Sequence, residues 1–126
     1  MTGAADPDNR RMMRFDGEIN NYEKKNKTEI SKLINLRKKH SALKQGDFYT
    51  LIANENCYAY IRSDMNERML VVLNKSDNEQ MIELNIPRIY DVKNAEDLSN
   101  GKLHKISDGK FSVTIPAIGW SMFVLN

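Results

Sequence analysis

The stretch from Cys57 to Asn74 reads CYAYIRSDMNERMLVVLN and decides the class of fold. Aromatic, β-branched and other apolar residues gather in two runs, each of ordinary strand length. The runs are separated by the turn-forming residues of Asp64 to Asn66. This pattern predicts an antiparallel hairpin, with strands at Cys57–Ser63 and Arg68–Asn74.

The same pattern of short runs and turns continues on both sides of the hairpin. Turn chemistry recurs at Asn54–Asn56, Lys75–Asn78, Ser99–Gly101 and Ser107–Gly109. Further strands are predicted at Phe48–Ala53, Gln80–Ile86, Tyr90–Val92, Leu103–Ile106, Lys110–Ile115 and Trp120–Leu125. Eight short strands joined by such turns are typical of a sandwich or a barrel. We expect a mainly β fold, an antiparallel Greek-key β-sandwich over residues 46–126, with Leu70, Val72, Phe123 and Leu125 in its core.

A helical pattern precedes the strands. Apolar residues recur at steps of three and four from Ile30 to Leu43, which is one face of an α-helix. Thr28 is the expected N-cap, and Gly46 is placed to end the helix, so one α-helix is predicted over 28–45. His40 is expected to interact with the helix dipole or to lie on the face packed against the sandwich. Residues 1–27 show no sustained apolar period and are expected to form a loop.

Composition narrows the classes of function. The chain has 126 residues, about one domain, with 19 basic and 17 acidic residues giving a net charge of +2. The charges form no concentrated basic patch, so we expect no nucleic-acid partner. No apolar run approaches the roughly 20 residues that span a bilayer, so we expect no membrane insertion. One cysteine, Cys57, and two histidines predict a buried inert thiol, no disulfide and no metal or other cofactor.

Two motifs carry a resemblance to a known family. Asp6-Pro7-Asp8-Asn9-Arg10-Arg11 stands near the start, and the stretch LINLRKKHSALKQGDF follows at Leu33–Phe48. Their order and spacing resemble the C-terminal part of α-amylase-type enzymes of glycoside hydrolase family 13. The resemblance implies a last loop of a (β/α)8 barrel at 1–27, the last barrel helix at 28–45 and the β-sandwich called domain C at 46–126. It leaves open the choice between an α-amylase, a cyclomaltodextrinase and a neopullulanase.

The resemblance also implies where the chemistry lies. The chain is far shorter than the roughly 250 residues of a barrel, and the family's catalytic acids lie upstream of the region it matches. We therefore expect a non-catalytic C-terminal domain that stabilises the catalytic barrel of an α-glucan-hydrolysing enzyme. Its expected partner is that barrel, and the isolated chain is expected to be soluble but to self-associate through the barrel-facing surface. The compartment stays unknown, because any signal peptide would lie upstream.

Asp6 and Arg10 are the candidate substrate-binding residues in the parent enzyme. Their spacing matches a pair that contacts glucose hydroxyls in many family members. A carboxylate accepts hydrogen bonds from vicinal hydroxyls and a guanidinium donates through a planar fork, so the pair could orient a sugar. The alternative is a salt bridge that holds the loop.

Tyr58, Tyr60 and Trp120 are candidates for accessory sugar stacking, which would make the chain an α-glucan-binding module. Tyr58 and Tyr60 lie two residues apart on one face of a predicted strand, close enough for a small platform. The alternative for the two tyrosines is half-buried packing with the hydroxyls at the rim. Trp120 is expected to fill the core or to seal a contact with the barrel. A third hypothesis is an unrelated all-β interaction domain.

Overall fold

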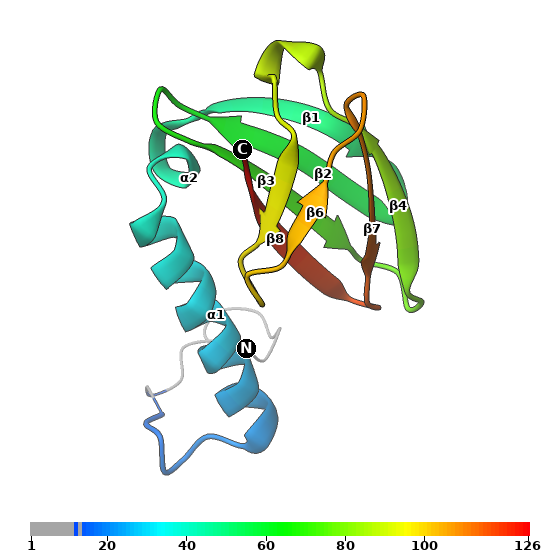
Figure 1. The fold of residues 1–126 in the computed structure, drawn as a ribbon. Helices are drawn as coiled ribbons and strands as arrows, with labels where there is room; N and C mark the ends of the chain where they lie inside the picture. Colours follow the sequence, from blue (N-terminus) through cyan, green and yellow to red (C-terminus); the bar gives the residue numbers. More distant parts are fainter. Residues whose placement is uncertain (1–11, 13) are drawn as a thin grey trace. The chain divides into compact units, whose positions relative to one another are not determined.

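The computed structural model describes Met12 and residues 14–126. The chain divides into two compact units, the residues up to Leu36 and the unit Arg37–Asn126. Each unit is described by itself below, with the elements labelled as in Figure 1.

Helix α1 spans Asn21–Lys39 and begins seven residues before the expected start. The Asn20 side chain accepts a hydrogen bond from the Glu23 backbone N–H at 2.9 Å, and the Glu23 carboxylate accepts one from the Asn20 N–H at 2.8 Å. This reciprocal pair is a capping box, which satisfies two backbone donors at a helix start. The expectation that Thr28 is the N-cap is wrong, since Thr28 lies inside α1 and its hydroxyl donates to the carbonyl of Lys24.

The helix ends earlier than expected as well. After Lys39 the chain leaves the helical path and resumes it in the four-residue helix α2, Ala42–Gln45. Gly46 ends α2 as expected, but with extended backbone, at φ −66° and ψ 154°. A Cβ at Gly46 would lie 2.6 Å from the Ala42 oxygen and 2.8 Å from the Ser63 oxygen, so glycine is required by close approach of the backbone.

Eight strands form two antiparallel sheets in the second unit (Figure 1). The larger sheet has the order β1-β2-β3-β8-β5-β6, and the smaller pairs β4 with β7. The bounds are β1 Asp47–Ala53, β2 Cys57–Ser63, β3 Arg68–Asn74, β4 Gln80–Asn85, β5 Asn94–Asp97, β6 Leu103–Lys105, β7 Lys110–Ile115 and β8 Gly119–Leu125. β5 and β6 form a hairpin, β7 crosses to the smaller sheet, and β8 returns beside β5, which is the Greek-key return. The predicted antiparallel β-sandwich is confirmed.

One predicted strand is wrong and one strand was missed. The region of Tyr90–Val92 holds a 3-10 turn, η1, at Arg88–Tyr90, and the strand comes later at Asn94–Asp97. That sequence, NAED, has little strand propensity of its own. It is held by pairing on both sides, with β6 and with β8, so tertiary hydrogen bonding overrides local preference.

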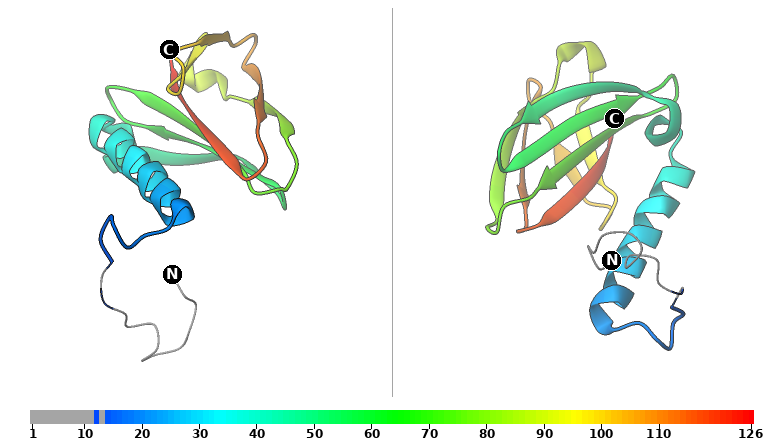
Figure 2. Two further views of the ribbon diagram at one scale, coloured as in Figure 1. Left: turned by 90° about the horizontal axis from the view of Figure 1, so that it is seen from below. Right: turned by 180° about the vertical axis from the view of Figure 1, so that it is seen from behind.

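The core lies between the two sheets, which face each other in both views of Figure 2. The expected core residues Leu70, Val72, Phe123 and Leu125 are all buried. They pack with side chains of the smaller sheet, including Ile82, Leu84, Phe111 and Ile115, and with the free thiol residue Cys57.

A second buried cluster lies on the other face of the larger sheet, which we call the outer face. There Ala42 and Leu43 of α2 cover Met69 and Val71 of β3. The central strand β3 is therefore buried on both faces along this part, which explains its continuous apolar run.

Candidate functional site

Asp6 and Arg10 lie outside the described residues, so the substrate-binding role predicted for them in a parent enzyme stays a prediction. The structure does place the other candidates, Tyr58, Tyr60 and Trp120, and all three lie on the larger sheet. It also shows a polar network and a loop pair that the sequence did not indicate.

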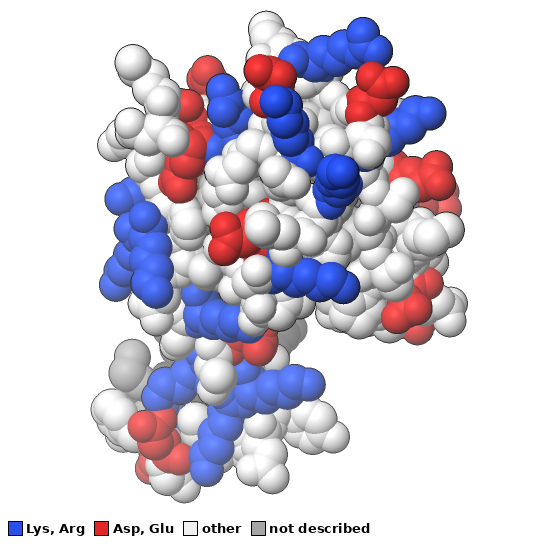
Figure 3. Space-filling view, viewed as in Figure 1, with Lys and Arg blue, Asp and Glu red and all other residues white. Residues whose placement is uncertain are grey.

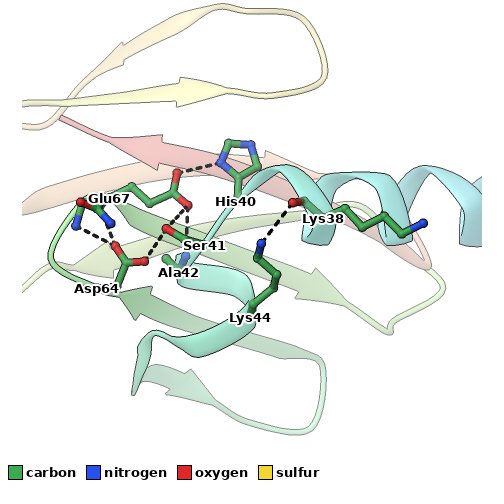
Figure 4. A network of polar contacts seen from close by, with 8 residues as sticks. Lys38, His40, Ser41, Ala42, Lys44, Asp64 and Glu67 are labelled. Carbon is green, nitrogen blue, oxygen red and sulfur yellow. Dashed lines mark hydrogen bonds and ion pairs between the residues drawn. The ribbon is translucent and has the colours of Figure 1, made fainter.

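The polar network joins the segment before α2 to the turn between β2 and β3 (Figure 4). His40 Nδ1 lies 2.8 Å from Glu67 Oε2, and the Ala42 backbone N–H donates to Glu67 Oε1 at 3.1 Å. The Ser41 hydroxyl donates to Asp64 Oδ2. We call these five residues, His40, Ser41, Ala42, Asp64 and Glu67, the junction clamp.

Asp64 organises its own turn as well as the clamp. Its Oδ1 accepts hydrogen bonds from the backbone N–H groups of Asn66 and Glu67, both at 2.8 Å. The bond from Ser41 and these two backbone donors hold the pKa of the Asp64 carboxyl below its usual value. At Glu67, burial opposes ionisation, but the bonds from His40 and from the Ala42 N–H outweigh it and lower the pKa. Both carboxylates are thus held in the charged form.

The clamp has the residue types of a hydrolase site but not the geometry. A serine nucleophile needs its hydroxyl bonded to a base that can take the proton, usually a histidine. Here Ser41 donates to the carboxylates of Asp64 and Glu67, while His40 pairs with Glu67. The arrangement fixes the chain at the start of α2. The sequence left two roles open for His40. In the structure its partner is Glu67, on the turn between β2 and β3.

Three aromatic rings cluster on the outer face, one from β1 and two from β2. Phe48 stacks on Tyr60 with ring centroids 4.7 Å apart and an interplanar angle of 27°. Tyr58 and Tyr60 are 5.3 Å apart but tilted by 39°, so they do not form a flat platform. Both tyrosines are half-buried, as in the packing alternative, whereas Phe48 is exposed. The Phe48 ring already occupies one face of Tyr60.

Trp120 belongs to a row of side chains across three strands. The register pairs Tyr58 with Leu73 and Leu73 with Trp120. Leu73 follows Val71 by two positions on β3, so it lies on the same outer face, but its side chain is 37% exposed. Trp120 is half-buried and lies outside the buried core cluster. The row Tyr58, Leu73 and Trp120 therefore lies on the same outer face, beyond the part that α2 covers.

A buried asparagine holds two loops at the same end of the sheet. The Asn74 amide nitrogen is directed at the carbonyl oxygens of Asn78, Ile115 and Pro116, at 2.8, 3.2 and 3.0 Å. Its oxygen accepts from the backbone and the hydroxyl of Ser76. The Ile118 N–H then donates to the Ser76 carbonyl at 3.0 Å, which ties the loop before β8 to the loop after β3.

The distribution of charges and of metal-binding residue types limits what these surfaces could bind. On the face drawn in Figure 3, basic and acidic side chains are interspersed rather than gathered into one patch. Within the part of the chain that the structure describes, no group of three His, Cys, Asp or Glu side chains could hold a metal ion. None of the described helices is long and apolar enough to cross a membrane.

Sequence reasoning missed the clamp, Phe48, Leu73 and the Asn74 loop pair. The clamp joins residues more than twenty positions apart, and no local pattern marks such pairing. Asn74 looks like an ordinary strand end, and only the fold brings it under the carbonyls of Ile115 and Pro116. A signal was available for Leu73, because the alternation that buries Leu70 and Val72 on one face places Val71 and Leu73 on the other.

Comparisons with known proteins agree with the architecture. Residues 49–122 match the family described as Maltogenic Amylase, C-terminal domain. A cyclomaltodextrinase from Geobacillus thermopakistaniensis is 29% identical over 128 residues, covering 100% of this chain and 21% of the relative. An amylopullulanase from Thermoanaerobacter thermohydrosulfuricus is 29% identical over 134 residues, covering 98% of this chain and 9% of the relative.

A solved structure has a similar fold. An α-amylase from Anoxybacillus superposes with a TM-score of 0.80 at 28% identity, covering 98% of this chain and 26% of that chain. The chain thus spans about a quarter or less of the proteins it resembles.

Proposed function

Because the chain belongs to the family of maltogenic amylase C-terminal domains, we propose that it is the non-catalytic C-terminal domain of an α-glucan-hydrolysing enzyme and that it stabilises the catalytic domain. Under this proposal the rest of the enzyme precedes the described residues. Under the same proposal, α1 is the last helix of the barrel of a family 13 enzyme. Asp6 and Arg10 are then residues of the last barrel loop that contact the sugar.

The observation that carries the proposal is the exposure of apolar side chains on α1. The helix has 19 residues and none of them is buried. Ile30 and Ile34, one turn apart on the same face, are 56% and 48% exposed. Helices of this length gain most of their stability in proteins from packing an apolar face, at roughly 25 cal/mol per Å2 of apolar surface removed from water. A catalytic domain of the same polypeptide supplies the missing contact.

The clamp supports a structural rather than a catalytic role. Hydrolysis of a glycosidic bond uses two carboxyl groups, one to protonate the leaving oxygen and one to attack or to activate water. Asp64 and Glu67 are the two carboxylates that the clamp brings together, and their oxygens are engaged by Ser41, His40 and backbone N–H groups. Both have a lowered pKa, which is the opposite of what a general acid needs.

Removal of the domain tests the proposal. We would compare the complete enzyme with a form that lacks residues 46–126, measuring the half-life of activity on maltoheptaose at rising temperature. The expected result is a shortened half-life with residual activity in the truncated form, and no hydrolysis by the 126-residue chain alone. Hydrolysis by the isolated chain, or an unchanged half-life after truncation, would overturn the proposal.

A second candidate is an accessory α-glucan site, favoured by the exposed ring of Phe48 beside Tyr58 and Tyr60. Carbohydrate modules stack flat, free rings against sugar faces, whereas Tyr58 and Tyr60 are tilted by 39° and Phe48 covers part of Tyr60. Titration of the isotope-labelled chain with maltoheptaose distinguishes the candidates. Amide shifts clustered at Tyr58, Tyr60 or Trp120 at millimolar sugar would favour the glucan site, and an unchanged spectrum would leave the stabilising role.

A further inference from the structure

The turn between β5 and β6 carries a dipeptide whose chemistry the proposed function does not use. Asn100 is followed by Gly101, and this is the single Asn-Gly pair in the sequence. Both residues are exposed, and Gly101 has φ +70°, in the left-handed region that glycine adopts without strain. Asparagine is among the thermolabile residues of proteins. A following glycine favours its breakdown, because no side chain hinders the approach of the glycine nitrogen to the asparagine amide carbon.

Hydrogen bonds hold the reacting groups of this pair in the folded turn. The Gly101 N–H donates to the carbonyl of Asp97 at 2.7 Å. The Asn100 side-chain oxygen accepts a hydrogen bond from the Lys102 N–H at 2.8 Å, and the side-chain nitrogen lies 3.4 Å from Asp97 Oδ2. In the closed turn the Gly101 nitrogen is therefore bonded through its proton to Asp97 and is held back from attacking Asn100.

The closed turn depends on Asp97, whose side chain is buried. Its Oδ1 accepts hydrogen bonds from the backbone N–H and the hydroxyl of Ser99, at 2.8 and 2.6 Å. Its backbone N–H donates to the Lys102 carbonyl at 2.9 Å. Beyond the turn, β6 has three residues and lies at the edge of the larger sheet, next to β5. Short edge elements open more readily than the central strands of a sheet.

We propose that Asn100 is a deamidation site whose reaction is controlled by opening of the β5–β6 turn. When the hydrogen bond from Gly101 to Asp97 opens, the Gly101 nitrogen loses its proton to a base in the solvent and bonds to the amide carbon of Asn100. The bond from this carbon to the side-chain nitrogen breaks, and that nitrogen takes up a proton and leaves as ammonia. Water then opens the cyclic imide at either carbonyl, which leaves aspartate or isoaspartate at position 100. The reaction consumes water, releases ammonia and involves no oxidation or reduction.

The product acts back on the turn that controls its formation. A carboxylate at position 100 replaces the amide nitrogen that faces the Asp97 carboxylate, and two negative charges this close repel each other. Isoaspartate also lengthens the main chain, which displaces the Gly101 N–H from the Asp97 carbonyl. Deamidation therefore holds the turn open. Because β5 also pairs with β8, the change weakens a strand inside the larger sheet.

Peptide mapping by mass spectrometry measures the reaction in the 126-residue chain. The chain is incubated below its unfolding temperature in mildly alkaline buffer, which favours loss of the nitrogen's proton. Trypsin then releases the peptide Asn94–Lys102, and fragmentation locates the change. Asn66 is the matched reference, an exposed turn asparagine that is followed by Glu67 instead of glycine.

We expect Asn100 to deamidate several-fold faster than Asn66 in the folded chain, and several-fold slower than in a synthetic peptide of the sequence 94–102. A rate at Asn100 no greater than that at Asn66 would overturn the site. A rate equal to that in the peptide would overturn the control by the turn.

Variants of the turn test its control of the reaction. Asp97→Asn removes the carboxylate that bonds Ser99, and it should raise the rate at Asn100 several-fold while the rate at Asn66 stays unchanged. An unchanged rate at Asn100 would exclude control through Asp97. A rise at Asn66 as well would indicate unfolding of the whole chain, and Ser99→Ala, which removes a single hydrogen bond to Asp97, then decides by the same comparison.

A second pair of variants tests the effect of the product. Asn100→Asp supplies the aspartate form directly, and Asn100→Ser is the control because it adds no charge. Hydrogen exchange of the Asp97 amide should be several-fold faster in Asn100→Asp than in Asn100→Ser. Equal exchange in the two variants would overturn the opening of the turn by the product.

Discussion

The two ends of the outer face are formed by the same strands but differ in how deeply their side chains are buried. At one end α2 lies over β3, so that Met69 and Val71 are fully buried. At the other end the row continues through Leu73 and Trp120, where the side chain of Leu73 is 37% exposed. The first end has its apolar cover within the chain, held by the junction clamp. The second end, which we call the open end and define as Tyr58, Leu73 and Trp120, is only partly buried.

The largest effect is expected from removing the cover. Leu43→Ala deletes a buried side chain that packs on Met69 and Val71, and we expect a loss of about 3 kcal/mol in the free energy of unfolding. Leu73→Ala at the open end should cost less than about 1 kcal/mol in the isolated chain, because that side chain is already partly in water. Urea unfolding of both variants measures the difference. Equal losses would mean that the two ends are not distinct.

The next effect comes from Asn74, which holds the two loops beside the open end. Asn74→Ala removes the amide that bonds the carbonyls of Asn78, Ile115 and Pro116 and the acceptor for Ser76. We expect a loss of about 2 kcal/mol in unfolding free energy, since partly buried carbonyls lose their donors. Hydrogen exchange of the Ile118 amide should rise at least as much as global stability falls. Retained protection of this amide would show that the loops do not depend on Asn74.

The clamp predicts a pH dependence at the covered end. The pKa values of Asp64 and Glu67 are lowered on folding from ordinary values of 3.8 and 4.5. A carboxyl with a lowered pKa in the folded state adds stability above its unfolded pKa and loses it as the pH falls through the folded value. Stability should therefore decline from about pH 4.5 downward. Glu67→Gln should cost about 1 kcal/mol at pH 7 and flatten the decline, as followed by urea unfolding between pH 3 and pH 7. An unchanged slope would exclude Glu67 as a contributor.

The smallest effect concerns association of the isolated chain. A net charge of +2 gives little repulsion between copies, so the uncovered apolar residues should lead to weak self-association at high concentration. Sedimentation velocity should show a rising weight-average coefficient with concentration, reduced in Leu73→Lys. A strictly monomeric profile at high concentration would contradict this prediction.

The sequence predicted the fold well where local pattern and packing agree. The strands Cys57–Ser63, Arg68–Asn74 and Lys110–Ile115 have the predicted bounds, because alternation and turn chemistry coincide there. Helix α1 was shortened in the prediction because its first turns are polar, and the capping box of Asn20 and Glu23 was not recognised. Strand β5 could not be found from NAED, since its place depends on β6 and β8.

The candidate surfaces were less predictable. Tyr58, Tyr60 and Trp120 do lie on one sheet, but their tilt and partial burial follow from the neighbouring strands. The left-handed backbone of Ile118 depends on Asn74 and Ser76 in another loop, which no pattern around Ile118 reveals. Contacts between distant segments set these features, and a single sequence does not display them.

The most direct test of the account is the solvent accessibility of Ile30 and Ile34 on α1 in the isolated chain and in the complete enzyme. Hydroxyl-radical labelling with mass spectrometry would follow Ile30 and Ile34, with Met81 on the smaller sheet as the reference. The account predicts that labelling of the two isoleucines falls several-fold in the complete enzyme while labelling of Met81 is unchanged. Equal labelling of Ile30 and Ile34 in the two forms would contradict it.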